Sequence, residues 1–429
     1  MLLRPTCSLV LLVAAALLPV QAATRPKNLI LLIGDGMGAA YTTGYRYYAD
    51  DPATPAVERT IFDELLVGMA STYPDEDATV VTDSAAAATA LATGSKSYNG
   101  AIGINRHGQA QASLLAKAKQ AGLATGIAVT AQINHATPAA FLAHNRDRDN
   151  YDAIADEYLD QPIADLLLGG GNSYFRRKDR DLIEGFIKRG YQLAVNEQSL
   201  QALKQLPAIG LFAPVGLPPA IDDDQGPRLP AMTQKALQLL SAGDQGFALM
   251  VECSQIDWAG HDNDVASAMH EMSECAETLR LLRDFAAQRG DTLVVATADH
   301  STGGLSIGAN GDYDWNPDVI KGVKGSSRKM ATELLNTTDW QAAVPGWLGF
   351  TPDASEQAAL VSAYALGEKA LAKALRQLVN NRSRSGWTTG GHTADDVQIF
   401  AYGPGSDQFR GYLDNTDIAK RMAALLPKR

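Results

Sequence analysis

The chain has 429 residues, of which 46% are hydrophobic and 20% are charged, and this composition is typical of a globular protein rather than a disordered one. Its 37 Lys and Arg residues against 48 Asp and Glu give a formal net charge of −11. A broad nucleic-acid-binding surface needs an excess of basic residues, so none is expected. An anionic ligand must therefore be attracted locally, by metal ions or by a few arginines.

Residues 1–22 have the pattern of a secretory signal peptide. Arg4 precedes an apolar run from Cys7 to Leu18, and small residues that favour cleavage after Ala22 follow it. The run is shorter than the about 20 residues that a membrane span needs, and no later segment is long and apolar enough to be one. We therefore expect a periplasmic or secreted protein without a membrane span, in which residues 23–429 form a single domain.

Apolar runs alternate with amphipathic helical patterns along the chain. The expected buried strands are Asn28–Ile33, Thr125–Val129, Asp165–Leu168, Phe247–Val251, Thr292–Thr297 and Val397–Ala401. The expected helices are Ser84–Thr93, Ser113–Ala121, Ile154–Leu159, Asp181–Lys188, Met232–Leu240 and Val265–Ala287. This alternation predicts an α/β fold with a largely parallel central sheet and helices on both faces. Residues 306–387, with a helix near Glu356–Val379, are expected to form an insertion over the sheet.

Two cysteines remain after the signal peptide. Cys253 lies at the end of an expected strand and Cys275 within an expected helix. An exported protein can pair such residues, but their separation cannot be read from the sequence. We expect two buried free thiols, and a disulfide is the alternative. No Cys-x-x-Cys spacing occurs, so a thiolate metal site is not expected.

A carboxylate follows the first expected strand, in Gly34-Asp35-Gly36. The loop does not fit a dinucleotide-binding turn, because Asp35 would repel a pyrophosphate. Ligands of open α/β sheets bind beyond the carboxyl ends of the strands, so Asp35 is placed to bind a metal ion. The alternative is an ordinary turn residue that caps the next helix.

Ionisable residues also lie near the ends of three other expected strands. They are Glu252 with Asp257 and His261, then Asp299 with His300, and finally His392. Parallel strands bring their carboxyl ends to one edge of the sheet, and residues four apart share a helix face, so these side chains are expected to cluster. Several carboxylates with three histidines suit zinc, and a remaining set of oxygen ligands suits magnesium.

Ser84 stands directly before an alanine-rich helix, after Thr82 and Asp83. Asp83 or Ser84 can be an ordinary helix N-cap. A serine at a helix N-terminus also faces free N–H groups and the positive end of the helix dipole, which bind phosphate and stabilise an alkoxide. No Gly-x-Ser-x-Gly motif surrounds Ser84, so activation by a metal ion fits better than a Ser-His-Asp triad.

Taken together, the motifs closely resemble those of alkaline phosphatase. In chain order they are LLIGDGMG, VTDSAAAATALATG, HATPAAFLAHNRDR, VECSQIDWAGHDND, TADHSTGG and GGHTADD. The resemblance runs from about Asn28 to about Pro404, and residues 306–387 match least specifically. It implies an alkaline-phosphatase-like α/β fold, hydrolysis of a broad range of small phosphate monoesters to inorganic phosphate and an alcohol, and a homodimer.

The resemblance also implies a site with two Zn²⁺ and one Mg²⁺. The ligands carried over are Asp257, His261 and His392 for the first zinc, Asp35, Asp299 and His300 for the second, and Asp35, Thr137 and Glu252 for magnesium. Ser84 would be the nucleophile that forms a phosphoserine, Arg148 would clamp the phosphate, and Asp83 would orient Arg148. The first zinc would receive the leaving-group oxygen and the second would ionise Ser84.

Two positions depart from one branch of this family. Where some members have Asp and Lys, this chain has His135 and Trp258. An imidazole nitrogen suits zinc better than the hard magnesium ion. We therefore expect the third metal site to exist but to bind magnesium less selectively. The alternative is that His135 only packs at the rim of the site.

Three other functions are less consistent with these residues. A sulfatase needs a cysteine in a Cys-x-Pro-x-Arg context, which is absent. A phosphodiesterase or nucleotide pyrophosphatase of the same superfamily is the alternative function, but Arg148, Thr137 and Glu252 favour monoesters. A non-catalytic zinc-binding protein would not need a serine at a helix start beside a phosphate-clamping arginine.

Overall fold

A computed structural model describes residues 25–223, 226 and 228–427. The expected signal peptide, residues 1–22, lies outside this range. Within the described residues, no helix combines the length and the hydropathy that a membrane crossing requires.

The described chain is built around a ten-stranded mixed sheet with the strand order β14-β2-β13-β8-β1-β7-β3-β4-β6-β5. The strands are β1 (Asn28–Gly34), β2 (Leu66–Ser71), β3 (Ala124–Gln132), β4 (Leu166–Gly170), β5 (Gln192–Ala194), β6 (Ala208–Leu211), β7 (Phe247–Cys253), β8 (Thr292–Ala298), β13 (Val397–Tyr402) and β14 (Gly411–Asp414). Neighbouring strands are parallel except at β13, which runs antiparallel to β8 and β2. The predicted α/β fold with a largely parallel sheet is confirmed.

All six strands expected from apolar runs are present. The central strands β1, β7, β8 and β3 are buried along their whole length, because helices cover both faces of a parallel sheet and leave no polar face. The other strands of this sheet, β2, β5, β6 and β14, lie toward its edges. Among them β2 has the short apolar sequence LVGMAS but is mostly half-buried or exposed, so it does not belong to the buried centre of the sheet.

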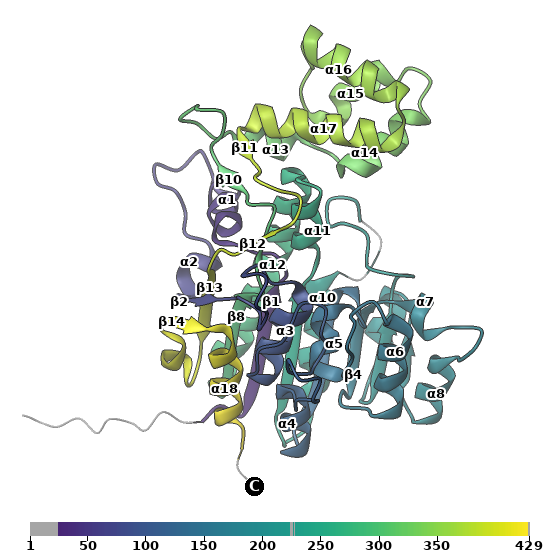
Figure 1. Cartoon of the computed structure of the whole chain (residues 1–429), viewed down its shortest axis with the longest axis vertical. Coiled ribbons are helices and arrows are strands. Elements are labelled where there is room, and N and C mark those ends of the chain that lie inside the picture. Colours follow the sequence, from purple (N-terminus) through teal and green to yellow (C-terminus); the bar gives the residue numbers. More distant parts are fainter. Residues whose placement is uncertain (1–24, 224–225, 227, 428–429) are drawn as a thin grey trace, which may run out of the picture.

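Helices pack on both faces of the sheet. On one face α10 and α12 contact the central strands, and on the other α4 and α5 do (Figure 1). The helices are α1 (Ala39–Ala49), α2 (Ile61–Leu65), α3 (Ser84–Thr93), α4 (Leu114–Gln120), α5 (Ala136–Leu142), α6 (Tyr151–Asp160), α7 (Asn172–Phe175), α8 (Leu182–Lys188), α9 (Glu197–Ala202), α10 (Leu229–Leu240), α11 (Gln255–His261), α12 (Val265–Arg289), α13 (Pro317–Gly322), α14 (Ser327–Leu335), α15 (Trp340–Leu348), α16 (Ala354–Ala365), α17 (Glu368–Ser383) and α18 (Asn415–Leu425), with a short 3-10 helix at Ser406–Phe409.

Residues 306–387 contain the helical group α13 to α17, which stands at the top of Figure 1. The single helix expected near Glu356–Val379 is wrong. Two helices, α16 and α17, occupy this region and are separated at Gly367. The φ of Gly367 is +92°, a conformation that breaks a right-handed helix and that glycine adopts readily.

The expectation of two free thiols is also wrong. Cys253, the last residue of β7, forms a disulfide with Cys275 of α12. The Cα atoms are 5.7 Å apart, which lies in the range that a disulfide spans. The packing of α12 against β7 sets this distance, and a sequence pattern does not report it. The bond ties α12 to the strand end that follows Glu252.

Candidate metal and phosphate site

The register of the central strands brings the predicted ligands to one edge of the sheet. Gly34 at the end of β1 is paired with Ala298 of β8 on one side and with Cys253 of β7 on the other. Asp35 and Asp299 each follow one of these strand ends, and Glu252 lies one residue before the third. Three carboxylates therefore lie on adjacent strands at the same level, as the sequence predicts.

The deep group consists of Asp35, Asp299 and His300, which are all fully buried. One potential ligand atom from each lies within 4.8 Å of the others. His300 Nε2 is 3.4 Å from Asp35 Oδ1 and 3.4 Å from Asp299 Oδ2. The backbone N–H groups of Gly36 and His300 donate to Asp299 Oδ1 at 3.0 and 2.9 Å. The other oxygen of each carboxylate, Oδ2, has no hydrogen-bond partner among the described residues.

The rim group consists of Asp257, His261 and His392, and it is partly open to solvent. Asp257 and His261 lie on the same face of α11, where His261 Nε2 is 3.3 Å from Asp257 Oδ2. His392 belongs to the short strand β12 (His392–Thr393), and its Nε2 is 3.5 Å from Asp257 Oδ1. The rings of His392 and His300 stack with centroids 3.6 Å apart, so the rim and deep groups adjoin.

Backbone carbonyls set the tautomers of both rim histidines. The Nδ1 atom of His261 donates to the carbonyl oxygen of Gly390 at 2.7 Å, and that of His392 donates to the carbonyl oxygen of Thr82 at 2.8 Å. In the neutral rings the lone pair is then on Nε2, and the two Nε2 atoms are only 3.2 Å apart. Facing lone pairs repel unless a proton or a metal ion lies beside them. Histidines that bind metal ions commonly donate their other ring N–H to a backbone carbonyl, which fixes the orientation of the ring.

A third group contains Asp35, His135 and Glu252, which are buried and have potential ligand atoms within 4.8 Å of one another. Both carboxylate oxygens of Glu252, Oγ1 of Thr137 and Nδ1 of His135 have no hydrogen-bond partner of normal geometry among the described residues. Unsatisfied buried polar atoms are costly. Their concentration here, beside the free oxygens of the deep group, fits a set of metal ligands.

Burial changes the protonation of these carboxyl groups. It raises the pKa of Glu252 to about 8 and that of Asp299 to about 7, and together with the Asp299 carboxylate it raises the pKa of Asp35 well above its usual value. Burial also lowers the pKa of His300. A cluster that disfavours both carboxylates and imidazolium without a cation is suited to hold positive metal ions.

Ser84 is the first residue of α3 and is buried. Its Oγ is 3.1 Å from His300 Nε2 and 3.5 Å from Asp35 Oδ1. Asp83 is the N-cap, and its Oδ1 accepts a hydrogen bond from the backbone N–H of Ala86 at 2.9 Å. The ordinary capping interpretation therefore holds for Asp83, while Ser84 remains directed at the deep group.

Arg148 lies opposite the start of α3. Its Nη1 donates to Asp83 Oδ2 at 3.0 Å, and the same oxygen accepts the backbone N–H of Gly100 at 2.9 Å. The Nη2 of Arg148 is 3.4 Å from Nε2 of His135. Asp83 thus caps the helix with one oxygen and holds the guanidinium with the other. This pairing leaves donors of a planar fork available to an anion.

His135 and Trp258, the two departures in the sequence, contact each other. Their rings are edge to face with centroids 6.0 Å apart. His135 is the N-cap of α5 and is buried, and burial together with the Arg148 charge lowers its pKa to about 3. A neutral imidazole with an unpartnered Nδ1 and a place in the third group can bind a metal ion, whereas simple rim packing would leave its nitrogens satisfied or solvated.

Thr302, which the sequence pattern does not single out, links the deep and rim groups. Its Oγ1 donates to Asp257 Oδ1 at 2.5 Å and is 3.2 Å from His300 Nδ1. Its backbone carbonyl accepts a hydrogen bond from Tyr41 Oη at 2.7 Å. In the sequence, only the position of Thr302 two residues after His300, in TADHSTGG, indicates a role in the site. A threonine at a strand end is too common to be singled out without that contact.

Comparison with known proteins agrees with this geometry. A sequence model of the family described as alkaline phosphatase matches residues 26–427. Alkaline phosphatase 3 of Bacillus subtilis (strain 168) is 46% identical over 409 residues, which cover 92% of this chain and 88% of the relative.

Solved structures show the same likeness. The crystal structure of a cold-active alkaline phosphatase from the psychrophile Shewanella sp. is 50% identical, with a TM-score of 0.91, and covers 94% of this chain and 100% of its own. The alkaline phosphatase from the Antarctic bacterium TAB5 is 27% identical, with a TM-score of 0.70 and coverage of 94% and 99%. Structures of two TAB5 variants, in which Glu or Asp replaces a histidine, are described with Mg bound in the M3 site. The chain belongs to the alkaline phosphatase family, and its activity is the hydrolysis of phosphate monoesters.

Proposed function

We propose that this protein hydrolyses a broad range of small phosphate monoesters through a phosphoserine formed on Ser84. The observation that carries the proposal is the position of Ser84 Oγ, which lies at the N-terminus of α3 within 3.1 Å of His300 Nε2 and 3.5 Å of Asp35 Oδ1. A serine placed there meets both the helix N-terminus and the deep group of ligands.

We assign one Zn²⁺ to the rim group, one Zn²⁺ to the deep group and one Mg²⁺ to the third group. The donor chemistry supports this assignment, because the rim group offers two imidazoles and the deep group one, while oxygens of Asp35, Thr137 and Glu252 outnumber the one imidazole of His135 in the third. When bound, such ions supply positive charge to the serine alkoxide and to the departing oxygen, and they lower the pKa of bound water.

The residues of this chain have distinct tasks in the proposed reaction. Ser84 Oγ gives its proton to water and attacks phosphorus, and the bond from phosphorus to the ester oxygen breaks as this oxygen takes a proton from water and leaves as the alcohol. Water then breaks the Ser84–phosphorus bond and releases inorganic phosphate. Arg148, held by Asp83, binds two oxygens of the phosphoryl group and keeps it aligned.

His135 distinguishes the third site of this chain. Asp35 and Glu252 supply oxygens, but His135 supplies nitrogen, and we propose that magnesium therefore binds there less selectively than in a site completed by a carboxylate. The TAB5 variants with Glu or Asp in place of a histidine and Mg in the M3 site are consistent with this reasoning.

We also propose that the protein is exported to the periplasm or secreted, and that it acts as a homodimer. The Cys253–Cys275 disulfide supports export, because disulfides form and persist mainly in oxidising compartments. The dimer rests on family resemblance.

Acid-quenched mass spectrometry tests the nucleophile. After incubation with inorganic phosphate, the wild type should carry one phosphoryl group on Ser84, and Ser84→Ala should carry none and lose most of its activity. Asp83→Asn is a matched variant at the adjacent residue, and it should still be phosphorylated. A phosphoryl group on another residue would show that Ser84 is not the nucleophile.

Two substrates distinguish a monoesterase from the alternative phosphodiesterase or nucleotide pyrophosphatase. p-Nitrophenyl phosphate should be hydrolysed with a much higher kcat/KM than bis-p-nitrophenyl phosphate, because Arg148 binds non-bridging oxygens of which a diester has fewer. The reverse preference would favour the phosphodiesterase.

A further inference from the structure

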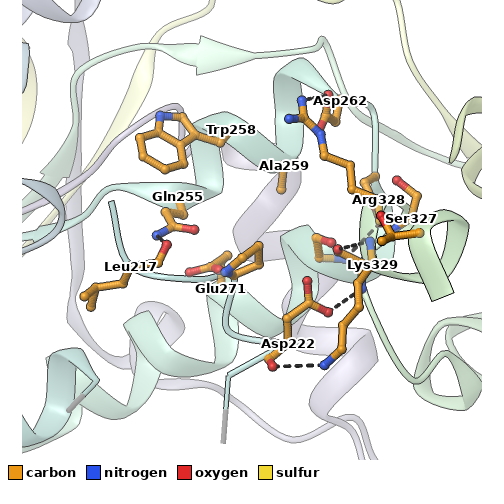
Figure 2. Close-up of a pocket in the computed structure, with 15 residues that line it drawn as sticks. Leu217, Asp222, Gln255, Trp258, Ala259, Asp262, Glu271, Ser327, Arg328 and Lys329 are labelled. Carbon is orange, nitrogen blue, oxygen red and sulfur yellow. Dashed lines mark hydrogen bonds and ion pairs between the residues drawn. The ribbon is translucent and has the colours of Figure 1, made fainter. Parts of the chain in front are cut away.

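A second cavity lies behind α11, away from the metal ligands. Its volume is about 380 Å³, which is within the range of small-molecule sites. Gln255, Trp258 and Ala259 of α11 line it, together with Asp262, which directly follows the helix. These residues occupy a helix face different from that of Asp257 and His261, since residues three and four apart share a face. Figure 2 shows them together with Arg328 and Lys329 from α14.

Two buried hydroxyl groups in the cavity lining have no partner. Ser267 of α12 and Ser327 of α14 are 5% and 1% exposed, and neither Oγ has a hydrogen-bond partner among the described residues. Their backbone N–H groups donate to the two oxygens of Asp264, at 3.1 and 2.9 Å. The backbone is thus satisfied while both hydroxyls remain free, which points to a polar ligand or water in this space.

The carboxylates of the lining are already engaged. Asp264 accepts the two backbone N–H groups just described, and Asp222 Oδ1 accepts the backbone N–H of Ser326 at 2.7 Å. Asp262 is paired with Arg328 through two hydrogen bonds of 2.8 and 2.9 Å, which Figure 2 shows at the top of the cavity. Glu271 Oε1 accepts the backbone N–H of Ala220 at 2.6 Å. These oxygens are directed at protein donors, so a metal ion would have to displace them.

Charge also disfavours an anionic ligand. The lining contains four acidic residues, Asp222, Asp262, Asp264 and Glu271, and two basic ones, Arg328 and Lys329. Arg328 is paired with Asp262, and Nζ of Lys329 donates to the backbone carbonyl of Asp222 at 3.1 Å. Free hydroxyls, the indole of Trp258 and the amide oxygen of Gln255 remain, since Nε2 of Gln255 donates to the carbonyl oxygens of Thr130 and Leu217 at 3.1 and 2.6 Å. Because the acidic groups are directed at protein donors and the net charge disfavours an anion, an aromatic face beside free hydroxyl groups suits an uncharged, hydroxyl-rich molecule.

We propose that this cavity binds a neutral polyol or monosaccharide, with its hydroxyl groups on Ser267 and Ser327 and its carbon skeleton against Trp258. The site is separate from the phosphate site, because none of the candidate metal ligands, nor Ser84 or Arg148, is among the described residues that line the cavity. Trp258 borders both, since its ring also contacts His135. The ligand is a free polyol rather than the alcohol part of a bound phosphate ester.

Isothermal titration calorimetry with sorbitol tests this proposal, with choline and citrate as cationic and anionic probes of similar size. Sorbitol should bind the metal-loaded wild type saturably, and the double variant Ser267→Ala/Ser327→Ala should bind it about 10-fold more weakly or worse, because each serine contributes a hydrogen bond. Absence of saturable binding, or stronger binding of choline or citrate, would overturn the proposal.

Ser97→Ala is the matched control. Ser97 is also fully buried with an unpartnered Oγ, but it does not line the cavity. It should leave sorbitol binding unchanged, and an equal loss in this variant would overturn the proposal. Hydrolysis of p-nitrophenyl phosphate should persist in both the double variant and Ser97→Ala, which shows that each is folded.

A sorbitol titration in saturating inorganic phosphate tests whether the hydroxyl groups bound in the cavity belong to a free polyol or to the alcohol part of a phosphate ester. If the cavity binds a free polyol, sorbitol should bind with phosphate present, and the double variant should keep the wild-type KM for glucose 6-phosphate. Competition between sorbitol and phosphate, or a raised KM for the sugar phosphate alone, would overturn the assignment as a separate site.

Discussion

The deep and rim groups present similar ligands in different surroundings. Asp35, Asp299 and His300 of the deep group follow two adjacent strands and are fully buried. Asp257 and His261 of the rim group lie on α11, and His392 reaches them from β12, 131 residues after His261. The sheet register positions the deep group, whereas helix α11, the short strand β12 and two backbone carbonyls position the rim group.

Because of this difference, we expect the two groups to respond differently when one of their residues is replaced. The deep group has carboxylates that repel one another when ionised, and burial raises their pKa values. Removal of one ligand there disturbs the serine and the neighbouring third group at once. The rim group is partly solvated, so that a weakened site can exchange metal ions with the solution.

The largest expected effect comes from Asp299→Ala. We expect kcat/KM to fall by about 10³-fold or more, because loss of metal-derived charge stabilisation costs several kcal/mol in the transition state. His392→Ala should lose less, about 10²-fold, and added zinc should restore part of its activity but none of that of Asp299→Ala. Kinetics with metal analysis measures both, and Asp244→Ala, an exposed carboxylate, is the control. Equal rescue of the two variants would contradict the distinction.

The second expected effect concerns the disulfide, which joins the strand end beside the deep group to α12. Cys253→Ala/Cys275→Ala should lower the free energy of unfolding by about 3 kcal/mol, since the bond closes a loop across 22 residues of sequence separation. Denaturant unfolding measures the loss. Wild type unfolded and refolded with reductant should behave as the variant does. The same midpoint in all samples would show that the disulfide does not stabilise the fold.

The smallest effect concerns His135. In His135→Asp, the magnesium concentration that gives half-maximal activity should fall about 10-fold, because a carboxylate oxygen replaces a neutral nitrogen beside a hard cation. Magnesium titrations of metal-stripped, zinc-reloaded enzyme measure this change. His107→Asp adds the same charge at an exposed position and should follow the wild-type curve. If His135→Asp follows it too, His135 is not a metal ligand.

Much of the fold and of the candidate site could be predicted because both depend on local patterns. Apolar runs identified the six main strands, and ionisable residues just beyond or within their ends identified Asp35, Glu252 and Asp299. The spacing of Asp257 and His261 placed them on one helical face, as α11 shows. Parallel strands must end at the same edge, so residues near those ends had to converge.

Other features depended on contacts that no local pattern reports. The Cys253–Cys275 bond required α12 to pack against β7, and the second cavity required α14 to approach α11 and α12.

By itself, the sequence determined which chemical groups stand at the strand ends, which helix begins with Ser84, and where the buried strands run. The tertiary structure decided that Thr302 joins the deep and rim groups and that Asp83 serves both the helix and Arg148. It also decided that Ser267 and Ser327 face a common cavity. The physical reason is range: periodicity and helix capping act over a few residues, whereas distances between side chains from distant segments are set only when those segments pack.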